Sequence, residues 1–253
     1  MDSMEERRNA IVNVVNERGN VTFAQLKEWF SDVSEMTLRT DLKHLDQEKR
    51  LVRVHGGAKS VNIVLGTDGL MGRRYVRNVE AKQEIVRKTM ELIRPNTTIF
   101  LDSGSTTTML AENWPDQPNF IFTNSLSCAM ALSKLKQPKV FMTGGELNTY
   151  SLSVCGMEAI DSLKKVNFDM IILGVTNYDS GFGFSCGVPG EAYLKQQVLN
   201  QAATKVVLMD TSKIGKKSTF HICNLKEVDI IVTENTDNNI IKKECMDFGI
   251  ELI

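Results

Sequence analysis

Apolar residues recur at helical spacing near the start of the chain. One run covers residues 4–17, and its apolar positions are Met4, Ala10, Ile11, Val14 and Val15. Arg18-Gly19-Asn20 is expected to end this helix, because glycine readily adopts the left-handed conformation that closes helices. Thr22 can then cap a second helix, with Gln25 placed to complete a capping box. That helix carries the apolar side chains Leu26, Trp29 and Phe30.

A third helix is predicted from Glu35 to about Glu48, after Ser34 as its N-cap. Its buried face consists of Leu38, Leu42 and Leu45. The opposite face carries polar or exposed groups, with a cation on each flank: Met36, Thr37, Thr40, His44 and Gln47, flanked by Arg39 and Lys43. Two helices joined by a tight turn, the second with such a face, are typical of a helix-turn-helix.

The residues after the third helix predict a short β-hairpin. Leu51-Val52-Arg53-Val54 alternates apolar and polar side chains like a strand, and His55-Gly56-Gly57-Ala58 is a turn. A hairpin in this position forms the wing of a winged helix-turn-helix, so we predict such a DNA-binding domain in residues 1–58. The pattern alone leaves one alternative, a protein-interaction module whose charged face is simply solvated.

Residues 59–79 lack a clear helical or strand period, and Gly66, Gly69 and Gly72 punctuate them. We expect an interdomain linker there. Its arginines, Arg73, Arg74 and Arg77, either are solvated or touch DNA or the second domain.

Strands and helices alternate over residues 80–253, the predicted second domain. Short apolar strands are expected at 98–101, 120–122, 140–142, 170–173, 206–209, 230–232 and 250–253. Helices are expected at 79–93, 106–113, 126–135, 191–203 and 239–247. This order predicts an α/β fold with a mostly parallel sheet covered by helices on both faces.

Polar residues cluster where the predicted strands end, which is where such sheets bind ligands. Four strand ends carry them: Asp102-Ser103-Gly104-Ser105-Thr106-Thr107-Thr108, Thr123-Asn124-Ser125, Thr143-Gly144-Gly145 and Asp210-Thr211-Ser212-Lys213. Helix N-termini and a lysine suit a phosphate, and aspartate suits sugar hydroxyls. Any one loop could simply cap a helix. The convergence of four predicts a site for a phosphorylated polyol.

The formal net charge is only −1, so the protein as a whole does not attract DNA. DNA binding therefore has to come from a local basic patch. Residues 39–77 contain nine Lys and Arg against four acidic residues, and phosphate binding needs such a local excess. The five cysteines include no C-x-x-C pair, which indicates free thiols in a reducing compartment. Without a signal-peptide or membrane-spanning run, we expect a cytoplasmic protein.

Motifs for several chemistries are absent from the sequence. It has no P-loop, no complete dinucleotide fingerprint, no His beside a Ser or Cys elbow and no metal-ligand spacing. We therefore expect no catalytic residues, no metal and no cofactor.

The two halves together resemble the DeoR family of bacterial transcription regulators. The N-terminal half carries S-x-x-T-[IL]-R-x-D-L as Ser34–Leu42 and R-x-H-G-G-A as Arg53–Ala58. The matching C-terminal stretches are Glu80-x-Lys82, 102–107, 123–125, Gly144-Gly145, Gly156, Asp169, Gly174, Gly181, Glu191 and 210–215. The family usually has a second arginine where this chain has Thr40, so one phosphate or guanine contact is expected to be missing.

The resemblance implies a sensor domain similar in fold to ribose-5-phosphate isomerase. It also implies a repressor of a carbohydrate-metabolism operon. A phosphorylated sugar or related metabolite is expected to release this repressor from DNA. In the major groove we expect Thr37, Arg39, Thr40 and Lys43 to contact the operator, with Arg53 and His55 reaching it from the wing. The expected effector-binding residues are Asp102, Gly104, Ser105, Thr106, Thr107, Thr123, Asn124, Gly144, Gly145, Asp210 and Lys213.

Two further expectations concern assembly and activity. Helix-turn-helix proteins usually bind paired half-sites, so we expect a homo-oligomer. The alternative to a regulator is a sugar-phosphate isomerase or transferase with an accessory DNA-binding segment, in which Asp102, Glu191 and Lys213 supply acid–base groups.

Overall fold

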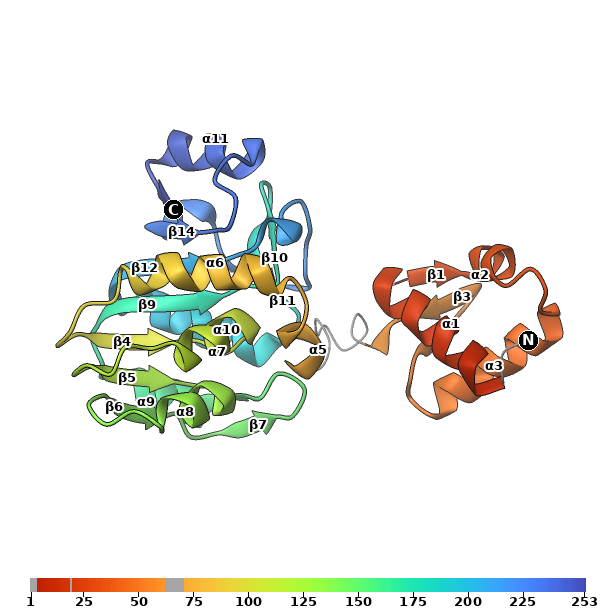
Figure 1. The fold of residues 1–253 in the computed structure, drawn as a ribbon, viewed down its shortest axis with the longest axis horizontal. Helices are drawn as coiled ribbons and strands as arrows, with labels where there is room; N and C mark the ends of the chain where they lie inside the picture. Colours follow the sequence, from red (N-terminus) through yellow and green to blue (C-terminus); the bar gives the residue numbers. More distant parts are fainter. Residues whose placement is uncertain (1–3, 19, 62–70) are drawn as a thin grey trace. The chain divides into compact units, whose positions relative to one another are not determined.

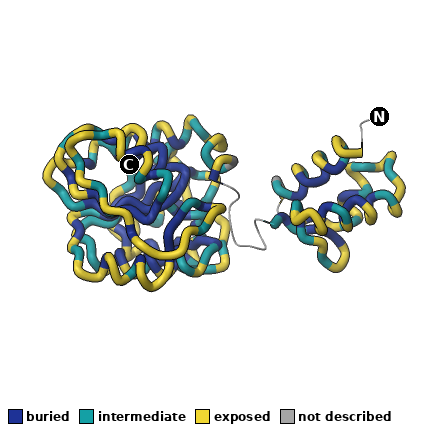
Figure 2. The backbone as a smooth tube through the Cα atoms, turned by 90° about the horizontal axis from the view of Figure 1, so that it is seen from below, coloured by how far each residue is buried: buried dark blue, intermediate teal, exposed yellow. Residues whose placement is uncertain are grey.

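The computed structural model describes residues 4–18, 20–61 and 71–253. The chain divides into two compact units, Met1–Asp68 and Gly69–Ile253. Each unit has a buried core of its own (Figure 2). The predicted helix stop at Gly19 and residues 62–70 of the predicted linker lie outside the described residues.

The first unit packs three helices against a small antiparallel sheet (Figure 1). Its elements are α1 (Met4–Arg18), β1 (Asn20–Thr22), α2 (Phe23–Trp29), α3 (Glu35–Gln47), β2 (Val52–Val54) and β3 (Gly57–Lys59). The strand order is β1-β3-β2. The sequence predicts the β2–β3 hairpin but only a helix stop at Asn20, whereas the structure pairs Val21 of β1 with Ala58 of β3.

Local capping fixes where α2 and α3 begin. The Oγ1 of Thr22 accepts a hydrogen bond from the Gln25 amide at 3.3 Å, and the Thr22 amide donates to Oε1 of Gln25 at 2.9 Å. The Oγ of Ser34 accepts from the Thr37 amide at 3.1 Å. These bonds satisfy N–H groups that a helix start otherwise leaves open, and they confirm the predicted caps.

A buried ion cluster ties α1 to α3. The Nε atoms of Arg7 and Arg8 donate to the two carboxylate oxygens of Asp41, at 2.7 and 2.9 Å. Asp41 lies on the buried side of α3 with the core leucines. The cluster therefore holds the first helix on the third by charge as well as by apolar packing.

The second unit contains a seven-stranded sheet in the part of the chain that the structure describes, in the order β15-β14-β12-β9-β4-β5-β6. All of its strand pairs are parallel, as predicted. These strands are β4 (Thr98–Leu101), β5 (Phe120–Thr123), β6 (Lys139–Met142), β9 (Phe168–Gly174), β12 (Ala202–Leu208), β14 (Ile230–Val232) and β15 (Glu251–Leu252).

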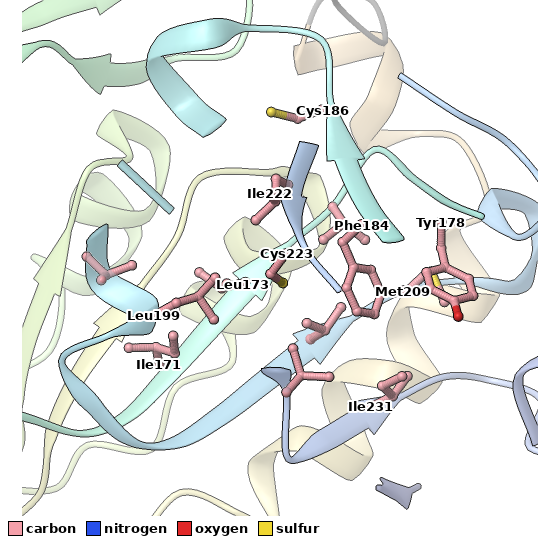
Figure 3. Close-up of a cluster of buried hydrophobic side chains, with 14 of the residues drawn as sticks. Ile171, Leu173, Tyr178, Phe184, Cys186, Leu199, Met209, Ile222, Cys223 and Ile231 are labelled. Atoms are coloured by element: carbon pink, nitrogen blue, oxygen red, sulfur yellow. The ribbon is translucent and has the colours of Figure 1, made fainter. Parts of the chain in front are cut away.

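Helices cover both faces of this sheet (Figure 1). One face packs against α6 (Val79–Met90), α7 (Ser105–Glu112) and α8 (Leu126–Leu132). The other packs against α9 (Met157–Leu163), α10 (Pro189–Leu199) and α11 (Asn239–Phe248). Figure 3 shows part of the core on the α9–α11 side of the sheet, where Tyr178 lies beside Met209, the residue after β12, and Leu173 lies beside Cys223. The arrangement confirms the predicted α/β class.

Several short elements escape the sequence analysis. They are α5 (Met71–Tyr75), β7 (Glu146–Asn148), β8 (Ser153–Cys155), β10 (Asn177–Asp179), β11 (Gly183–Cys186), β13 (Phe220–Cys223) and the 3-10 turns η1 (Thr211–Lys213) and η2 (Leu225–Glu227). Each is too short to show a period. The helix predicted at 191–203 ends at Leu199, because Ala202 already pairs with Phe168 in the central sheet.

Every helix in the described ranges is too short or too polar to cross a bilayer.

Candidate functional site

The exposed face of α3 carries the predicted DNA-contacting cations. Arg39, Thr40 and Lys43 are exposed, whereas Leu38 and Leu42 on the other side are buried in the first core. The Arg39 guanidinium lies 4.3 Å from the ring centre of Phe23, and its Nη2 lies 3.9 Å from a carboxylate oxygen of Glu35. These weak contacts leave the arginine at the surface, in a defined orientation.

The wing lies beside this face. A cavity of about 330 Å³ is lined by Arg39 and Leu42 of α3, by Phe23, and by the wing residues 53–57. It therefore gathers three of the six predicted DNA-contacting residues, Arg39, Arg53 and His55. The Arg53 amide donates to Oδ1 of Asp46 at 2.9 Å, which fixes the wing to the end of α3.

The two predicted threonines are partly engaged within the helix. The Oγ1 of Thr40 donates to the carbonyl of Met36 at 2.9 Å, and the hydroxyls of Thr37 and Ser34 lie 2.8 Å apart. The proton of the Thr40 hydroxyl is thus directed at a carbonyl of its own helix, whereas an arginine at this position would extend its cation away from the helix. Cations are the groups that this surface presents outward.

In the second unit, three polar residues form a row across neighbouring strand ends. Leu101 pairs with Thr123, and Thr123 pairs with Met142, so the residues that follow are Asp102, Asn124 and Thr143. Residues in register on parallel strands point to the same face of a sheet. We call these three residues the polar row.

Each member of the polar row has buried polar atoms without a hydrogen-bond partner among the described residues. They are Oδ1 of Asp102, both side-chain amide atoms of Asn124, and Oγ1 of Thr143. Asp102 and Asn124 are fully buried, and Thr143 is 6% exposed. Most buried polar groups in proteins have a partner, so a row of unpartnered ones indicates a place for a polar ligand or for water.

Helix α10 brings a buried lysine to this row. The Nζ of Lys195 donates to Oδ2 of Asp102 and, at 2.6 Å, to the carbonyl of Gly174. The Gly174 amide donates to the same Oδ2 at 3.0 Å. One turn before Lys195, Glu191 accepts a hydrogen bond of 2.8 Å from Oγ of Ser153 in β8. The row therefore continues into a buried charged cluster of Asp102, Lys195 and Glu191.

The sequence analysis omits Lys195 from the site, and it places Thr143 at one of the converging strand ends without including it among the effector-binding residues. A signal for Lys195 was present, because Glu191 and Lys195 are four residues apart on the side of α10 that also carries Leu194 and Val198. Charged residues within an apolar helix face are rare unless they are paired or functional. For Thr143 the signal was its place at a strand end, but a threonine there is ordinary and does not by itself indicate a ligand contact.

Burial and pairing shift the ionisation of this cluster. Burial raises the pKa of Asp102, and Lys195 only partly opposes that shift. Burial alone would lower the pKa of Lys195, but the nearby Asp102 and Glu191 raise it overall. The oxygen atoms around Lys195 therefore favour its charged ammonium form.

The predicted anion-binding loop leads from the polar row into α7. Gly104 has φ +152° and precedes the helix, which begins without a side-chain cap. The hydroxyls of Thr107 and Thr108 donate back to the Gly104 carbonyl, at 3.0 and 2.7 Å. Ser105 and Thr106 are buried as well, and the open N–H groups of the first turn of α7 begin three residues after Asp102.

Other predicted effector residues have structural partners elsewhere. Asp210 accepts from Nδ2 of Asn78 at 3.1 Å and lines a cavity of about 510 Å³ at the start of α6, whose lining contains no member of the polar row. Burial opposes ionisation of Asp210, but Lys213, Ser212 and Asn78 outweigh it and hold its pKa below the usual range. The Nζ of Lys213 donates to the Val175 carbonyl at 2.8 Å.

The remaining predicted residues shape the backbone around the row. The Oγ1 of Thr123 accepts from the Ser125 amide at 3.0 Å. Gly145 has φ +121°, and a Cβ there would lie 2.3 Å from the Cys155 carbonyl, so this glycine allows β8 to approach. A Cβ on Gly144 would meet no atom within 4 Å, which leaves that position open.

Comparisons with known proteins match both units. The family model of the DeoR-like helix-turn-helix domain matches residues 7–64, and that of the DeoR C terminal sensor domain matches residues 77–235. The lactose phosphotransferase system repressor of Staphylococcus epidermidis is 31% identical over 251 residues, covering 98% of each chain. The HTH-type transcriptional regulator GlpR of Haloferax volcanii is 28% identical over 249 residues, covering 98% of this chain and 96% of the relative.

These relatives are transcription regulators and not enzymes. A solved ribose 5-phosphate isomerase A from Methanocaldococcus jannaschii is 17% identical and covers 54% of this chain and 55% of its own, with a TM-score of 0.41. That likeness is too slight to support the isomerase alternative or the expected isomerase-like fold.

Proposed function

The chain belongs to the DeoR family of transcription regulators, and on that premise we propose that it represses a carbohydrate operon and leaves its operator when a phosphorylated sugar binds the second unit. The observation that carries the effector half is the polar row, with its buried unpartnered atoms, in a chain whose first unit exposes a recognition helix.

The proposed DNA contacts are Thr37, Arg39, Thr40 and Lys43 from α3 and Arg53 and His55 from the wing. Arg39, Arg53 and His55 line one cavity, which supports a single docking surface for a groove and its flanking phosphates. Cations at this surface supply an attraction to DNA that the near-neutral whole molecule lacks.

The proposed effector contacts divide by chemistry. Oδ1 of Asp102 needs a donor, and the free atoms of Asn124 and Thr143 can donate or accept, which suits the hydroxyl groups of a sugar. The N-terminus of α7 suits an anionic group such as a phosphate. Several relatives are named as repressors of a lactose phosphotransferase system, among them one of Streptococcus mutans, 31% identical over 242 residues.

Two further parts of the proposal concern assembly and location. Regulators of this kind usually bind paired half-sites, so the chain is a homo-oligomer on DNA. Sedimentation analysis of the full chain measures that state directly, and a monomer under all conditions contradicts it. Access to an operator places the protein in the cytoplasm.

The DNA-binding half is tested with Arg39→Ala and the control Arg94→Ala, whose side chain is exposed in the second unit. Duplexes selected from a random library by the wild type serve as operator. Arg39→Ala should lose about 1–3 kcal/mol of binding free energy while unfolding at the wild-type temperature, whereas Arg94→Ala binds normally. Equal affinity of all three proteins would contradict the assigned surface.

The effector half is tested by a thermal-shift screen of sugar phosphates against their parent sugars. A ligand at a hundred times its dissociation constant stabilises the native state by about 2.7 kcal/mol, which such a screen detects. We expect one phosphate to shift unfolding and to release the operator, with no effect of its parent sugar. Equal shifts by sugar and phosphate would argue against an anion-binding role for α7.

A further inference from the structure

Helix α5 is docked on the second unit at the rim of the candidate effector site. It lies within the range where the sequence predicts a linker, and residues 60–70 separate it from β3 of the DNA-binding unit. Its contacts therefore join the part of the chain that leads to the DNA-binding unit to the part that would hold the effector.

Both ends of α5 are fixed. The Met71 amide donates to the Tyr150 carbonyl, between β7 and β8, at 2.9 Å, and the Met71 side chain is buried. At the other end, Nζ of the buried Lys82 donates to the carbonyls of Arg74 and Arg77. An ammonium at the carbonyl end of a helix donates hydrogen bonds to the carbonyls that lack a partner within the helix, and it interacts favourably with the negative end of the helix dipole.

A third contact joins α5 to α7. The hydroxyl of Tyr75 donates to a carboxylate oxygen of Glu112 in the last turn of α7, and this bond raises the pKa of Tyr75 to about 12. Helix α5 thus spans from the β7–β8 hairpin to α7, along the side of the loop that precedes α7.

The Arg74 guanidinium reaches that loop. A Cβ built on Gly104 would lie 3.8 Å from Nη2 of Arg74 and 3.4 Å from Oγ1 of Thr107. Gly104 is the residue before the uncapped N-terminus of α7 and lies two residues after Asp102. The buried Oδ1 of Asp102 has no hydrogen-bond partner among the described residues. A fixed cation, a helix N-terminus and an unpartnered buried carboxylate oxygen therefore meet at one loop.

We infer that Arg74 binds the anionic group of the effector at the N-terminus of α7 and so couples occupancy of the site to helix α5. This inference rests on the proposed function and adds the residue that connects the effector site to α5, the helix that follows the segment leading from the DNA-binding unit. An arginine contacts phosphate oxygens through paired N–H groups, in a geometry that lysine does not reproduce. An anion held between Arg74 and α7 stabilises the docked position of α5, and a ligand can change DNA affinity only through such a difference between bound and free states.

The test uses the full chain with inorganic phosphate as the probe, against sodium chloride at matched ionic strength. The variants are Arg74→Gln and Arg74→Lys, with Arg94→Gln as the control, because Arg94 lies before β4, at the opposite end of the strand from Asp102. Phosphate should raise the unfolding temperature of the wild type and of Arg94→Gln. Arg74→Gln should need roughly tenfold more phosphate for the same shift, with Arg74→Lys in between.

Hydrogen exchange of peptides covering residues 71–78 tests the coupling. Phosphate should slow exchange there in the wild type and not in Arg74→Gln. Equal phosphate dependence of the wild type and Arg74→Gln, a wild type that does not respond to phosphate, or unchanged exchange at α5 would each overturn the inference. Binding of selected operator duplexes without phosphate is measured in parallel. If the wild type does not bind these duplexes, the proposed repressor function is contradicted. Failure of the Arg74 inference and failure of the proposed function therefore give different results.

Discussion

Single buried polar residues do different work in the two units. Asp41 is fully paired by Arg7 and Arg8, so its charge stabilises the first unit. Asn124 in the polar row is just as buried, yet its side-chain amide makes no hydrogen bond among the described residues, so this side chain adds no hydrogen bond to the stability of the second unit. The first pattern is typical of a structural residue and the second of a binding residue.

Replacing Asp41 by Asn should destabilise the first unit by on the order of 3 kcal/mol, because Arg7 and Arg8 lose their counter-charge. Urea unfolding followed by Trp29 fluorescence in a Trp114→Phe background measures this loss. Arg87→Gln is the control, since Arg87 is exposed on α6 and its ion pairs with Glu84 and Glu91 lie at the surface. A variant as stable as the wild type would show that the ion cluster contributes little.

The same residue sets a pH dependence. Burial opposes ionisation of Asp41, but the hydrogen bonds from Arg7 and Arg8 outweigh it and lower its pKa. A carboxyl with a lowered folded pKa contributes stability above its unfolded pKa of about 4, and that stability is lost as the pH falls further. Unfolding of the first unit should therefore become easier below about pH 4 in the wild type, and less so in Asp41→Asn.

Two asparagines of the second unit make a matched pair for testing the polar row. Asn119 is buried with hydrogen bonds to the Arg94 carbonyl and to Oγ1 of Thr97, at 2.7 and 2.9 Å. Asn119→Ala should lose about 2 kcal/mol of stability, and Asn124→Ala close to none. Asn124→Ala should nevertheless lose the thermal shift with the effector found by screening. Strong destabilisation by Asn124→Ala would mean that its amide has a structural partner.

At the scale of elements, the wing depends on one close backbone approach. A Cβ on Gly57 would lie 2.1 Å from the Val21 carbonyl, across the β1–β3 pair. Gly57 therefore allows β1 to join the hairpin, and the hairpin in turn holds Arg53 and His55 beside α3.

Gly57→Ala should consequently cost more than about 2 kcal/mol of stability in the first unit and weaken operator binding. Gly72→Ala is the matched control in α5, where a Cβ would meet no atom within 4 Å. It should stabilise that helix by up to about 1 kcal/mol, because alanine favours helices more than glycine does. Calorimetry of the full chain compares the two, and a stable Gly57→Ala would refute the close approach.

Elements with a clear period or cap could be predicted from the sequence, and those set by tertiary contacts could not. Leu38, Leu42 and Leu45 define α3, and the apolar runs define the strands of the parallel sheet. Strand β1 exists only because β3 pairs with it, and α5 exists only on the surface that Lys82 and Tyr150 provide. Strand ends identified Asp102 and Asn124, but Lys195 reaches Asp102 from α10, a helix distant in sequence.

At the scale of the whole molecule, the thiols are distributed unevenly. Cys128, Cys155, Cys186, Cys223 and Cys245 are all buried and all belong to the second unit. Burial raises the pKa of each thiol, for example to about 11 for Cys128 and about 12 for Cys223. A raised pKa suppresses the reactive thiolate, and burial blocks reagents.

Iodoacetamide at pH 8 should therefore label the native chain at least about a hundredfold more slowly than free cysteine. Labelling during urea titration, read by mass spectrometry, should follow unfolding of the second unit alone. The urea concentration at which labelling begins should therefore be the same in Asp41→Asn as in the wild type. Rapid labelling of any of the five thiols in the native protein would contradict their burial.

The docking of α5 on the second unit determines where a DNA-binding unit can be replaced by that of a related regulator. A hybrid that joins a foreign DNA-binding head at residue 80, where alternation of strands and helices begins in the sequence, would discard α5 with Arg74 and leave Lys82 without the carbonyls it caps. A hybrid joined before Met71 keeps them. Recombination that preserves a working switch should therefore cut ahead of α5, so that the head is the exchangeable part and the helix travels with the sensor.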